Sequence, residues 1–371
     1  MAENKFLHLA APGLKGLQPY QPGKPIDELK REYGVKDIIK LASNENPLGP
    51  SPLALQAMQS EFVELARYPD GNGFELKQTI AQKFDVAMNQ VTLGNGSNDI
   101  LEFIARAFVT AENEVVFSQH AFAVYPLVTQ AVNAKAVVTP AKNWGHDLDA
   151  MKAAINERTR VVFIANPNNP TGTWVDGDTL KAFIAAVPDH VIVVVDEAYF
   201  EYANDPRMKA DGYPNATQWL AEFPNLVVTR TFSKAYGLAA LRVGYGISHP
   251  DIADLLNRVR QPFNVNHMGL VAATAALGDK QYLEESITLN ATGMQQLIEG
   301  ADRLGLEYIP SVANFLSIDV GKDSATVYDD LLREGVIVRP VANYDMPNHI
   351  RVTIGLPEEN ERFLVALQKV L

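Results

Sequence analysis

The chain of 371 residues is long enough for two domains with substantial hydrophobic cores. Its 32 basic and 44 acidic residues give a formal net charge of −12, which argues against nucleic acid or an anionic membrane as a partner. Cysteine is absent, so disulfides and cysteine nucleophiles are excluded, and no metal site is expected. The N-terminus shows no secretory pattern, and no apolar run approaches the roughly 20 residues of a membrane span. We therefore expect a soluble, cytoplasmic protein.

Strand-like and helix-like segments alternate through the middle of the chain. Strands are expected at residues 91–93, 114–117, 136–138, 161–164, 191–195 and 226–229, and helices at 99–109, 123–131 and 178–186. Five consecutive β-branched residues at 191–195 are typical of a strand covered on both faces, as in parallel sheets. The alternation predicts an α/β sheet with helices on both faces.

A different pattern begins near residue 251, where a long helical segment leads to strands near 315–318, 336–338 and 349–354. This mixture predicts a second, smaller α+β domain that also takes up residues from the N-terminal arm. We expect residues 1–40 to form the arm and part of the small domain, residues 41–265 to form the large domain, and residues 266–371 to form the small C-terminal domain.

Residues 94–99 read GNGSND and lie between an expected strand and an expected helix. Backbone N–H groups at the start of a helix, with the helix dipole behind them, are suited to bind phosphate. The same loop is also a good helix N-cap, so by itself it is weak evidence for a phosphate site.

Two further segments each contain or follow an apolar strand. Residues 165–172 read ANPNNPTG, and their prolines and glycine force a defined turn. Residues 191–199 read VIVVVDEAY, which places Asp196 and Tyr199 at the C-terminal end of a strand, where open α/β sheets bind their ligands. Asp196 is either a helix N-cap or a buried acid that faces a protonated ring nitrogen.

Lys234 lies in the run TFSKAYGLAALRVG at residues 231–244. An amine with a hydroxyl beside it and a cation nearby suits an aldehyde cofactor, because burial and positive charge lower the pKa of the amine and leave it able to react. Ser233 and Arg242 are suited to hold a phosphate. Taken alone, Lys234 could equally be a solvated surface residue.

In this order and spacing, the last three segments resemble the fold-type-I, pyridoxal-phosphate-dependent aminotransferases, and the resemblance covers about residues 41 to 355. It implies a large domain with a mostly parallel mixed sheet between helices, a smaller α+β domain, and pyridoxal 5′-phosphate as the cofactor. It also implies transfer of an amino group from a small-molecule donor to a 2-oxo acid acceptor.

The resemblance assigns a role to each matching residue. Lys234 is the expected catalytic residue, which first holds the cofactor and then moves the proton. The other residues expected to bind the cofactor are Gly96, Ser97, Asn98, Ser233 and Arg242 at its phosphate, Phe122 stacked on its ring, Asn169 and Tyr199 at its phenolic oxygen, and Asp196 at its ring nitrogen. Without the resemblance, Phe122 is more simply interpreted as a core phenylalanine.

Arg351 lies in the middle of an expected strand, HIRVTIG at residues 349–355. An arginine on an alternating strand usually faces solvent, but Arg351 matches the carboxylate-binding arginine of the resembled family. It is therefore the expected ligand of the substrate anion. Arg339 is a second and less secure candidate for this contact.

The periphery of the chain resembles the histidinol-phosphate aminotransferase branch of the family. The matching segments are SNENPLGPSP at 43–52, PYQPG at 19–23, RYPD at 67–70 and QPFNVN at 261–266. The resemblance implies that Asn44 and Tyr20 bind the substrate. It also implies that Tyr68 reaches the cofactor phosphate of a neighbouring subunit, which predicts a homodimer with shared active sites.

The implied reaction converts histidinol phosphate and 2-oxoglutarate to imidazole-acetol phosphate and glutamate, a step of histidine biosynthesis. An imidazole is close in shape to a phenyl ring, so an aromatic amino-acid aminotransferase is the nearest alternative. A pyridoxal-phosphate-dependent decarboxylase or lyase, and a non-enzymatic binding protein on the same scaffold, are more distant alternatives.

Overall fold

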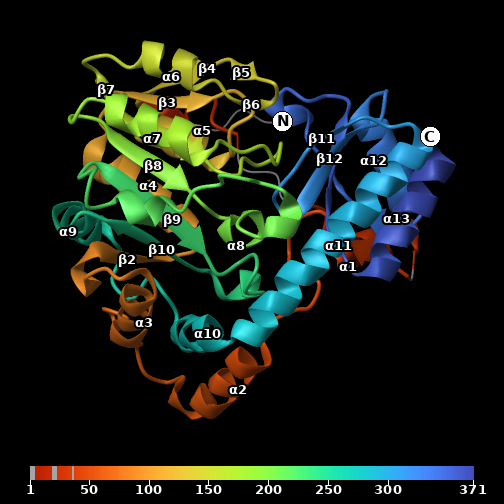
Figure 1. Ribbon diagram of the computed structural model, residues 1–371, viewed down its shortest axis with the longest axis horizontal. Coiled ribbons are helices and arrows are strands. Elements are labelled where there is room, and N and C mark those ends of the chain that lie inside the picture. The colour runs from red at the N-terminus through yellow and green to blue at the C-terminus, as the bar shows by residue number, and fades with distance from the viewer. Residues whose placement is uncertain (1–4, 19–22, 36) are drawn as a thin grey trace.

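The computed structural model describes residues 5–18, 23–35 and 37–371. Its centre is a seven-stranded sheet in the order β2-β10-β9-β8-β7-β3-β4 (Figure 1). The strands are β2 (Val91–Asn95), β3 (Glu114–Ser118), β4 (Lys135–Thr139), β7 (Thr159–Ala165), β8 (Ile192–Asp196), β9 (Leu226–Thr231) and β10 (Val243–Ser248). Neighbours are parallel except for β10, which is antiparallel to both β9 and β2. The predicted α/β fold with a mostly parallel mixed sheet is confirmed.

Side chains that alternate along these strands build a core on each face of the sheet. On one face, Val115, Phe117 and Val161 pack among residues of α4 (Ser97–Phe108), α5 (Val124–Ala131) and α9 (Pro250–Val259). On the other face, Val116 and Val162 join the core built with α3 (Phe74–Phe84), α6 (Leu148–Ala154), α7 (Gly177–Ala186) and α10 (His267–Gly278). The sheet is therefore buried between two layers of helices, and its strand ends are left to carry polar groups.

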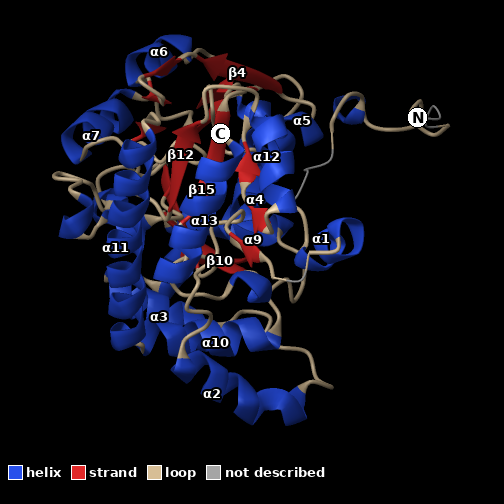
Figure 2. Cartoon of the chain, turned by 90° about the vertical axis from the view of Figure 1, so that its right-hand side faces the viewer, coloured by secondary structure: helices blue, strands red, loops and turns tan. Residues whose placement is uncertain are grey.

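A smaller, antiparallel sheet has the order β11-β12-β15-β14. Its strands are β11 (Tyr308–Ile309), β12 (Phe315–Asp319), β15 (His349–Thr353) and β14 (Arg339–Pro340). The helices α12 (Ser324–Arg333), α13 (Pro357–Val370) and the C-terminal half of α11 (Lys280–Leu304) contribute to its core, and α12 and α13 lie in front of it in Figure 2.

The segment before the large domain joins this smaller unit. The strand β1 (Ile39–Lys40) pairs with β13 (Val336–Ile337) in parallel. On α1 (Ile26–Tyr33), Leu29 belongs to one buried cluster with Leu332 of α12. The remaining α-helices and strands are α2 (Pro52–Glu61), α8 (Phe200–Ala203) and the hairpin of β5 (Ala141–Lys142) and β6 (Gly145–His146).

The packing of α10 bears on where the two domains divide. This helix contributes Leu270 and Ala273 to the core of the large sheet, and it lies against α2 at the bottom of Figure 1. The long α11 then continues into the core of the small sheet through Met294 and Leu297. The expected boundary at residue 265 has no independent test. Because α10, which follows that residue, packs with the large sheet, we propose that the division between the domains instead lies inside α11.

Candidate active site

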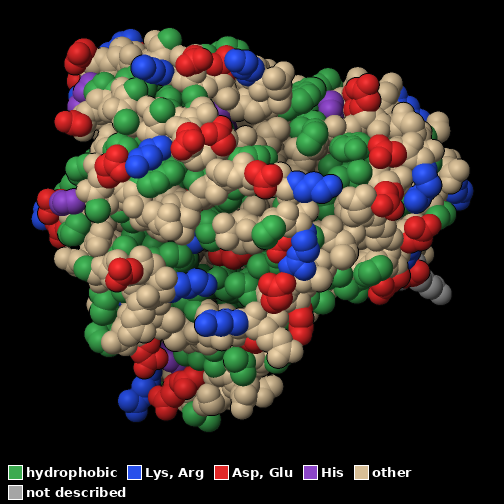
Figure 3. All heavy atoms as spheres, viewed as in Figure 1, with side chains coloured by type: hydrophobic (Ala, Val, Ile, Leu, Met, Phe, Trp, Pro, Cys, Tyr) green, Lys and Arg blue, Asp and Glu red, His purple; other side chains and the backbone are tan. Residues whose placement is uncertain are grey.

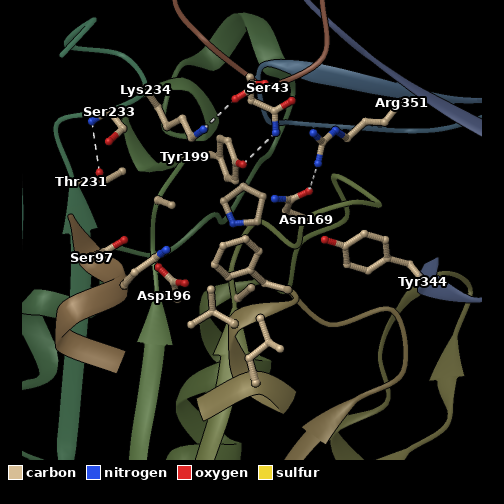
Figure 4. A pocket seen from close by; sticks show the side chains of 18 of the residues that line it. Ser43, Ser97, Asn169, Asp196, Tyr199, Thr231, Ser233, Lys234, Tyr344 and Arg351 are labelled. Carbon is tan, nitrogen blue, oxygen red and sulfur yellow. Dashed lines mark hydrogen bonds between the residues drawn. The ribbon is translucent and has the colours of Figure 1, made fainter. Parts of the chain in front are cut away.

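A cavity of about 370 Å³ opens where β7, β8 and β9 end, and β15 closes it from the small domain (Figure 4). Eleven of the predicted site residues line it: Asn44, Ser97, Asn98, Phe122, Asn169, Asp196, Tyr199, Ser233, Lys234, Arg242 and Arg351. They come from segments more than 300 residues apart in the chain. The structure therefore brings most of the predicted site residues together at the carboxyl ends of the parallel strands, where α/β folds of this kind bind their ligands.

Lys234 follows β9 and extends into the cavity, where its Nζ lies 3.1 Å from the backbone oxygen of Ser43. Figure 4 shows this amine above the ring of Tyr199, 5.8 Å from the ring centroid. Burial, together with the positive charges of Arg351 and Arg242, lowers the pKa of the Lys234 amine from 10.5 to about 7. A substantial fraction of this amine is therefore neutral and nucleophilic near pH 7.

Asp196 is the last residue of β8 and is only 4% exposed. Its Oδ1 accepts a hydrogen bond from Thr229 and its Oδ2 accepts one from Tyr125, each at 2.9 Å. Burial raises the pKa of the Asp196 carboxyl from 3.8 to about 6, although the two hydrogen bonds oppose this effect. No cation among the described residues is a cause of this shift. Asp196 is thus a buried acid suited to pair with a positive group that a ligand brings.

Polar groups at the opposite edge of the cavity form a cradle for an anion. The helix α4 begins at Ser97, and the backbone of Gly96 before it has a φ of +79°. A Cβ atom on Gly96 would lie 2.6 Å from Nη2 of Arg242, so another residue here would displace this guanidinium as well as strain the backbone at its positive φ. Nη1 of Arg242 lies 3.3 Å from Oγ of Ser233, whose backbone N–H donates to Oγ1 of Thr231. The N-terminus of the twelve-residue helix α4, the guanidinium of Arg242 and the nearby hydroxyl groups together are suited to bind a phosphate.

A hydrogen-bond network fixes the polar side chains at the small-domain end of the cavity. Asn44 donates from Nδ2 to the hydroxyl oxygen of Tyr199 at 2.9 Å, so the phenolic hydrogen of Tyr199 is left to donate to a ligand. Burial raises the pKa of Tyr199 to about 12, which keeps that hydrogen in place. Arg351 donates from Nη1 to Oδ1 of Asn169 at 2.5 Å and from Nη2 to the backbone oxygen of Ala42 at 2.8 Å. Asn169 therefore keeps its amide hydrogens for a ligand.

Phe122 also lines the cavity, on the loop after β3. Its ring meets Tyr125 edge to face, with centroids 5.9 Å apart. Tyr125 is stacked in turn on Phe163, with centroids 4.7 Å apart. Phe122 thus packs against the core cluster and also lines the cavity, where its ring is available to a ligand.

Gly96 lies next to the lining residue Ser97 but does not itself line the cavity, and neither do Tyr68 and Arg339. Tyr68 is 82% exposed and stacks on Phe263, with ring centroids 4.7 Å apart. Arg339 of β14 lies across from Arg351 in the antiparallel register with β15, but it is not among the described residues that line the cavity. Tyr20 lies outside the described residues. The roles expected of Tyr68, Arg339 and Tyr20 remain predictions.

The structure adds residues that the sequence pattern did not single out. Ser43 and Thr231 flank predicted residues, so proximity in the chain could have suggested them. Tyr125 and Thr229 hold Asp196 from α5 and β9, and Tyr344 enters the cavity from the small domain. Only the packing of distant segments places these last three residues near the site.

The chain belongs to the class I and II aminotransferase family, whose sequence profile matches residues 36–367. It is 63% identical to histidinol-phosphate aminotransferase 2 of Pseudomonas fluorescens strain Pf-5, over 99% of this chain and 98% of the relative. It is 57% identical to histidinol-phosphate aminotransferase 1 of Nitrosococcus oceani, over 100% and 99% of the two chains.

A solved structure also resembles this chain closely. The histidinol-phosphate aminotransferase from Sinorhizobium meliloti, in complex with pyridoxal 5′-phosphate, superimposes with a TM-score of 0.88 at 31% identity and covers 97% of each chain. Aspartate aminotransferase of Thermus thermophilus with maleate, at 19% identity and a TM-score of 0.83, shares the fold.

Proposed function

We propose that this chain is a pyridoxal-phosphate-dependent aminotransferase that exchanges an amino group between histidinol phosphate and 2-oxoglutarate. One observation carries the reaction class: Lys234, with its pKa lowered to about 7, shares a single cavity with the buried acid Asp196 and the anion cradle at Arg242. The names of relatives that are 57% and 63% identical over nearly their whole length support the substrate.

The residues of the cavity fit pyridoxal 5′-phosphate part by part. Ser97, Ser233 and Arg242 line the cavity and offer N–H, hydroxyl and guanidinium donors to the phosphate, and Gly96 precedes Ser97 at the start of α4. Asp196 pairs with the protonated ring nitrogen, which supplies the cation that this buried carboxylate lacks. Phe122 offers a ring face for stacking, while Asn169 and Tyr199 offer donors for the phenolic oxygen. When bound, the cofactor supplies an electron sink for negative charge that develops at a substrate carbon.

Lys234 has two tasks in this proposal. Its neutral amine attaches the cofactor at rest, because the low pKa leaves a free electron pair near neutral pH. Once the substrate amine has displaced it, Nζ of Lys234 would take the proton from the substrate carbon and hold it for return. The backbone oxygen of Ser43 accepts a hydrogen bond from Nζ and so orients this amine.

Arg351 is the proposed ligand for the substrate anion. Its guanidinium is held by Asn169 and by the backbone of Ala42, so its position is fixed before the substrate arrives. A guanidinium can bind either a carboxylate or a phosphate, which lets one site serve both glutamate and histidinol phosphate. Arg339 and Tyr20 remain predicted further contacts.

A comparison of kcat/KM for histidinol phosphate, phenylalanine, tyrosine and aspartate tests the substrate. We expect histidinol phosphate to be preferred, with 2-oxoglutarate as the amino acceptor and the aromatic amino acids as slower substrates. If an aromatic amino acid exceeds histidinol phosphate tenfold, about 1.4 kcal/mol of transition-state stabilisation, the substrate is wrong although the reaction class stands. Release of carbon dioxide or ammonia, without formation of glutamate from 2-oxoglutarate, would instead indicate a decarboxylase or lyase.

We also propose that the active unit is a homodimer in which Tyr68 completes the partner's site. Eight large apolar or aromatic side chains between residues 48 and 74 are exposed, which is typical of a surface that a partner covers: Leu48, Leu53, Leu55, Phe62, Val63, Leu65, Tyr68 and Phe74. Figure 3 shows apolar side chains at the lower end of the molecule, where α2 lies. Within its own subunit Tyr68 does not reach the cavity, so only another copy can use it there.

Mixed dimers test this sharing. Lys234→Ala and Tyr68→Phe subunits, each shown to be impaired, should regain activity on subunit exchange, because a hybrid has one intact site. Confirmed exchange without recovery would refute a shared site.

Within the described part of the chain, no helix is long and apolar enough to cross a membrane. The expected cytoplasmic location remains a prediction.

A further inference from the structure

Tyr344 enters the cavity from the small domain. It ends η7 (Ala342–Tyr344), the short turn between β14 and β15, and only 8% of it is exposed. In Figure 4 its ring points into the cavity toward Asn169, on the side away from Ser97 and Ser233. The strand that follows the turn carries Arg351. Tyr344 and the proposed anion ligand therefore reach the same end of the cavity from one hairpin.

The turn that carries Tyr344 is fastened to the large domain. Nδ1 of His120 lies 2.5 Å from the backbone oxygen of Tyr344. A carbonyl oxygen can only accept, so this ring nitrogen must carry the hydrogen. Nε2 of Gln119 lies 3.4 Å from Oδ2 of Asp345, and Ala123 packs against the apolar cluster that contains Tyr344. The large-domain loop that carries Phe122 thus sets the position of the Tyr344 turn.

The charge of the proposed substrate calls for a second donor at this end. A phosphate monoester has three terminal oxygens and a charge of about −1.5 to −2 near neutral pH, whereas a carboxylate has two oxygens and a charge of −1. The Arg351 guanidinium supplies one positive charge and already donates to Asn169 and Ala42. Arg351 and Tyr344 both line the cavity, and both act electrostatically on the phenol of Tyr199, so the two side chains lie at the same end of the cavity.

We propose that Tyr344 determines specificity by donating its hydroxyl hydrogen to the phosphate of the substrate beside Arg351, and that His120 is the positioning residue that holds Tyr344 there. The inference rests on the proposed function, because it assumes that the bound substrate carries a phosphate. It predicts that the hydroxyl matters for a phosphate ester and much less for an amino acid with a carboxylate at that place.

Tyr344→Phe removes the hydroxyl and keeps the ring. In the holoenzyme, we expect this change to lower kcat/KM for histidinol phosphate at least tenfold, mainly through KM, and to leave kcat/KM for glutamate within about twofold. Inorganic phosphate, tested as a competitive inhibitor against glutamate, should bind at least fivefold more weakly. Tyr308→Phe, a change to a half-buried tyrosine of the small domain that does not line the cavity, is the control and should alter none of these values.

Equal losses for both substrates, or no loss for the ester and unchanged inhibition by phosphate, would refute the role of Tyr344. If the wild-type enzyme uses glutamate but not histidinol phosphate, the proposed substrate fails. The inhibition constant of phosphate then still decides whether Tyr344 binds this anion.

Two substitutions of His120 test its positioning role. His120 has a φ of +57°, which asparagine tolerates well, and the asparagine Nδ2 lies as many bonds from the backbone as Nδ1 of histidine. His120→Ala should raise KM for histidinol phosphate at least fivefold with kcat within threefold, and His120→Asn should restore most of the loss. Equal impairment of both variants would show that the hydrogen bond to Tyr344 is not what positions it.

Discussion

Replacement of Asp196 by asparagine should stabilise the cofactor-free enzyme while it weakens cofactor binding. The pKa of the buried carboxyl is raised from 3.8 to about 6. Its ionised form therefore destabilises the fold, and a difference of about two pKa units corresponds to about 3 kcal/mol. An asparagine has no charge to desolvate, and its amide can still bond to the hydroxyls of Tyr125 and Thr229.

The sign and the pH range of this effect follow from linkage. The folded state holds the Asp196 proton more tightly than the unfolded state, so Asp196 favours folding at low pH and this contribution is lost as pH rises from about 4 to about 6. Above that range the wild-type protein carries the full cost and Asp196→Asn does not. The variant should therefore gain stability at pH 8 and very little at pH 4.

Thermal unfolding of the cofactor-free proteins measures this difference. An unfolding entropy of about 2.1 cal/mol/K per residue makes 3 kcal/mol equivalent to about 4 °C in Tm for a chain of this length. Titration with pyridoxal 5′-phosphate should show weaker binding to the variant. Asp176→Asn is a matched control, because its carboxyl caps α7 through the backbone N–H of Thr179 and has a lowered pKa. A variant at Asp196 that is no more stable than wild type at pH 8 would refute the reasoning.

Three further outcomes are expected. Lys234→Ala should reduce transamination by several orders of magnitude, and borohydride should fix the cofactor to the wild-type chain but not to this variant; turnover near the wild-type rate would contradict the role of Lys234. The rate of cofactor uptake by the cofactor-free enzyme should rise with pH through about 7, because the neutral form of the Lys234 amine reacts. Arg351→Gln should move the midpoint of this pH profile upward, because it removes a nearby positive charge. A midpoint above 9 for the wild-type enzyme would argue against a desolvated amine. Arg230→Met should cost about 3–5 kcal/mol of unfolding free energy in urea, because it leaves the buried Glu197 without its ion pair, and Glu197→Gln in the same chain should recover much of the loss.

Local patterns in the sequence were sufficient for much of the large domain. The buried strand at residues 192–196 follows from its run of β-branched residues, and the expected helix at 178–186 is found as α7 (Gly177–Ala186). The positions of Lys234, Asp196 and Asn169 could be assigned because each lies in a short segment beside a recognisable strand or turn.

The strand β10 shows where local preference fails. Residues 243–248 contain two glycines, which are unfavourable in strands, and the sequence did not predict this element. The structure gives the reason, because a Cβ on Gly246 would lie 2.8 Å from Ile100 of α4 and one on Gly244 would overlap the start of that helix. The glycines allow α4 to approach β10 closely, and this approach brings Ser97 to the cavity.

The sequence by itself determined the fold class and, through its resemblance to a known family, the type of cofactor, and it predicted Lys234 as the reacting lysine, because the motifs that carry the resemblance are runs of neighbouring residues. The tertiary structure alone decided where distant residues lie: the hydroxyls of Tyr125 and Thr229 on Asp196, Tyr344 at the same end of the cavity as Arg351, and Tyr68 outside the cavity of its own subunit. These placements depend on the packing of helices and sheets from two domains. The burial that lowers the pKa of Lys234 and raises that of Asp196 comes from the same packing, which a linear pattern does not contain.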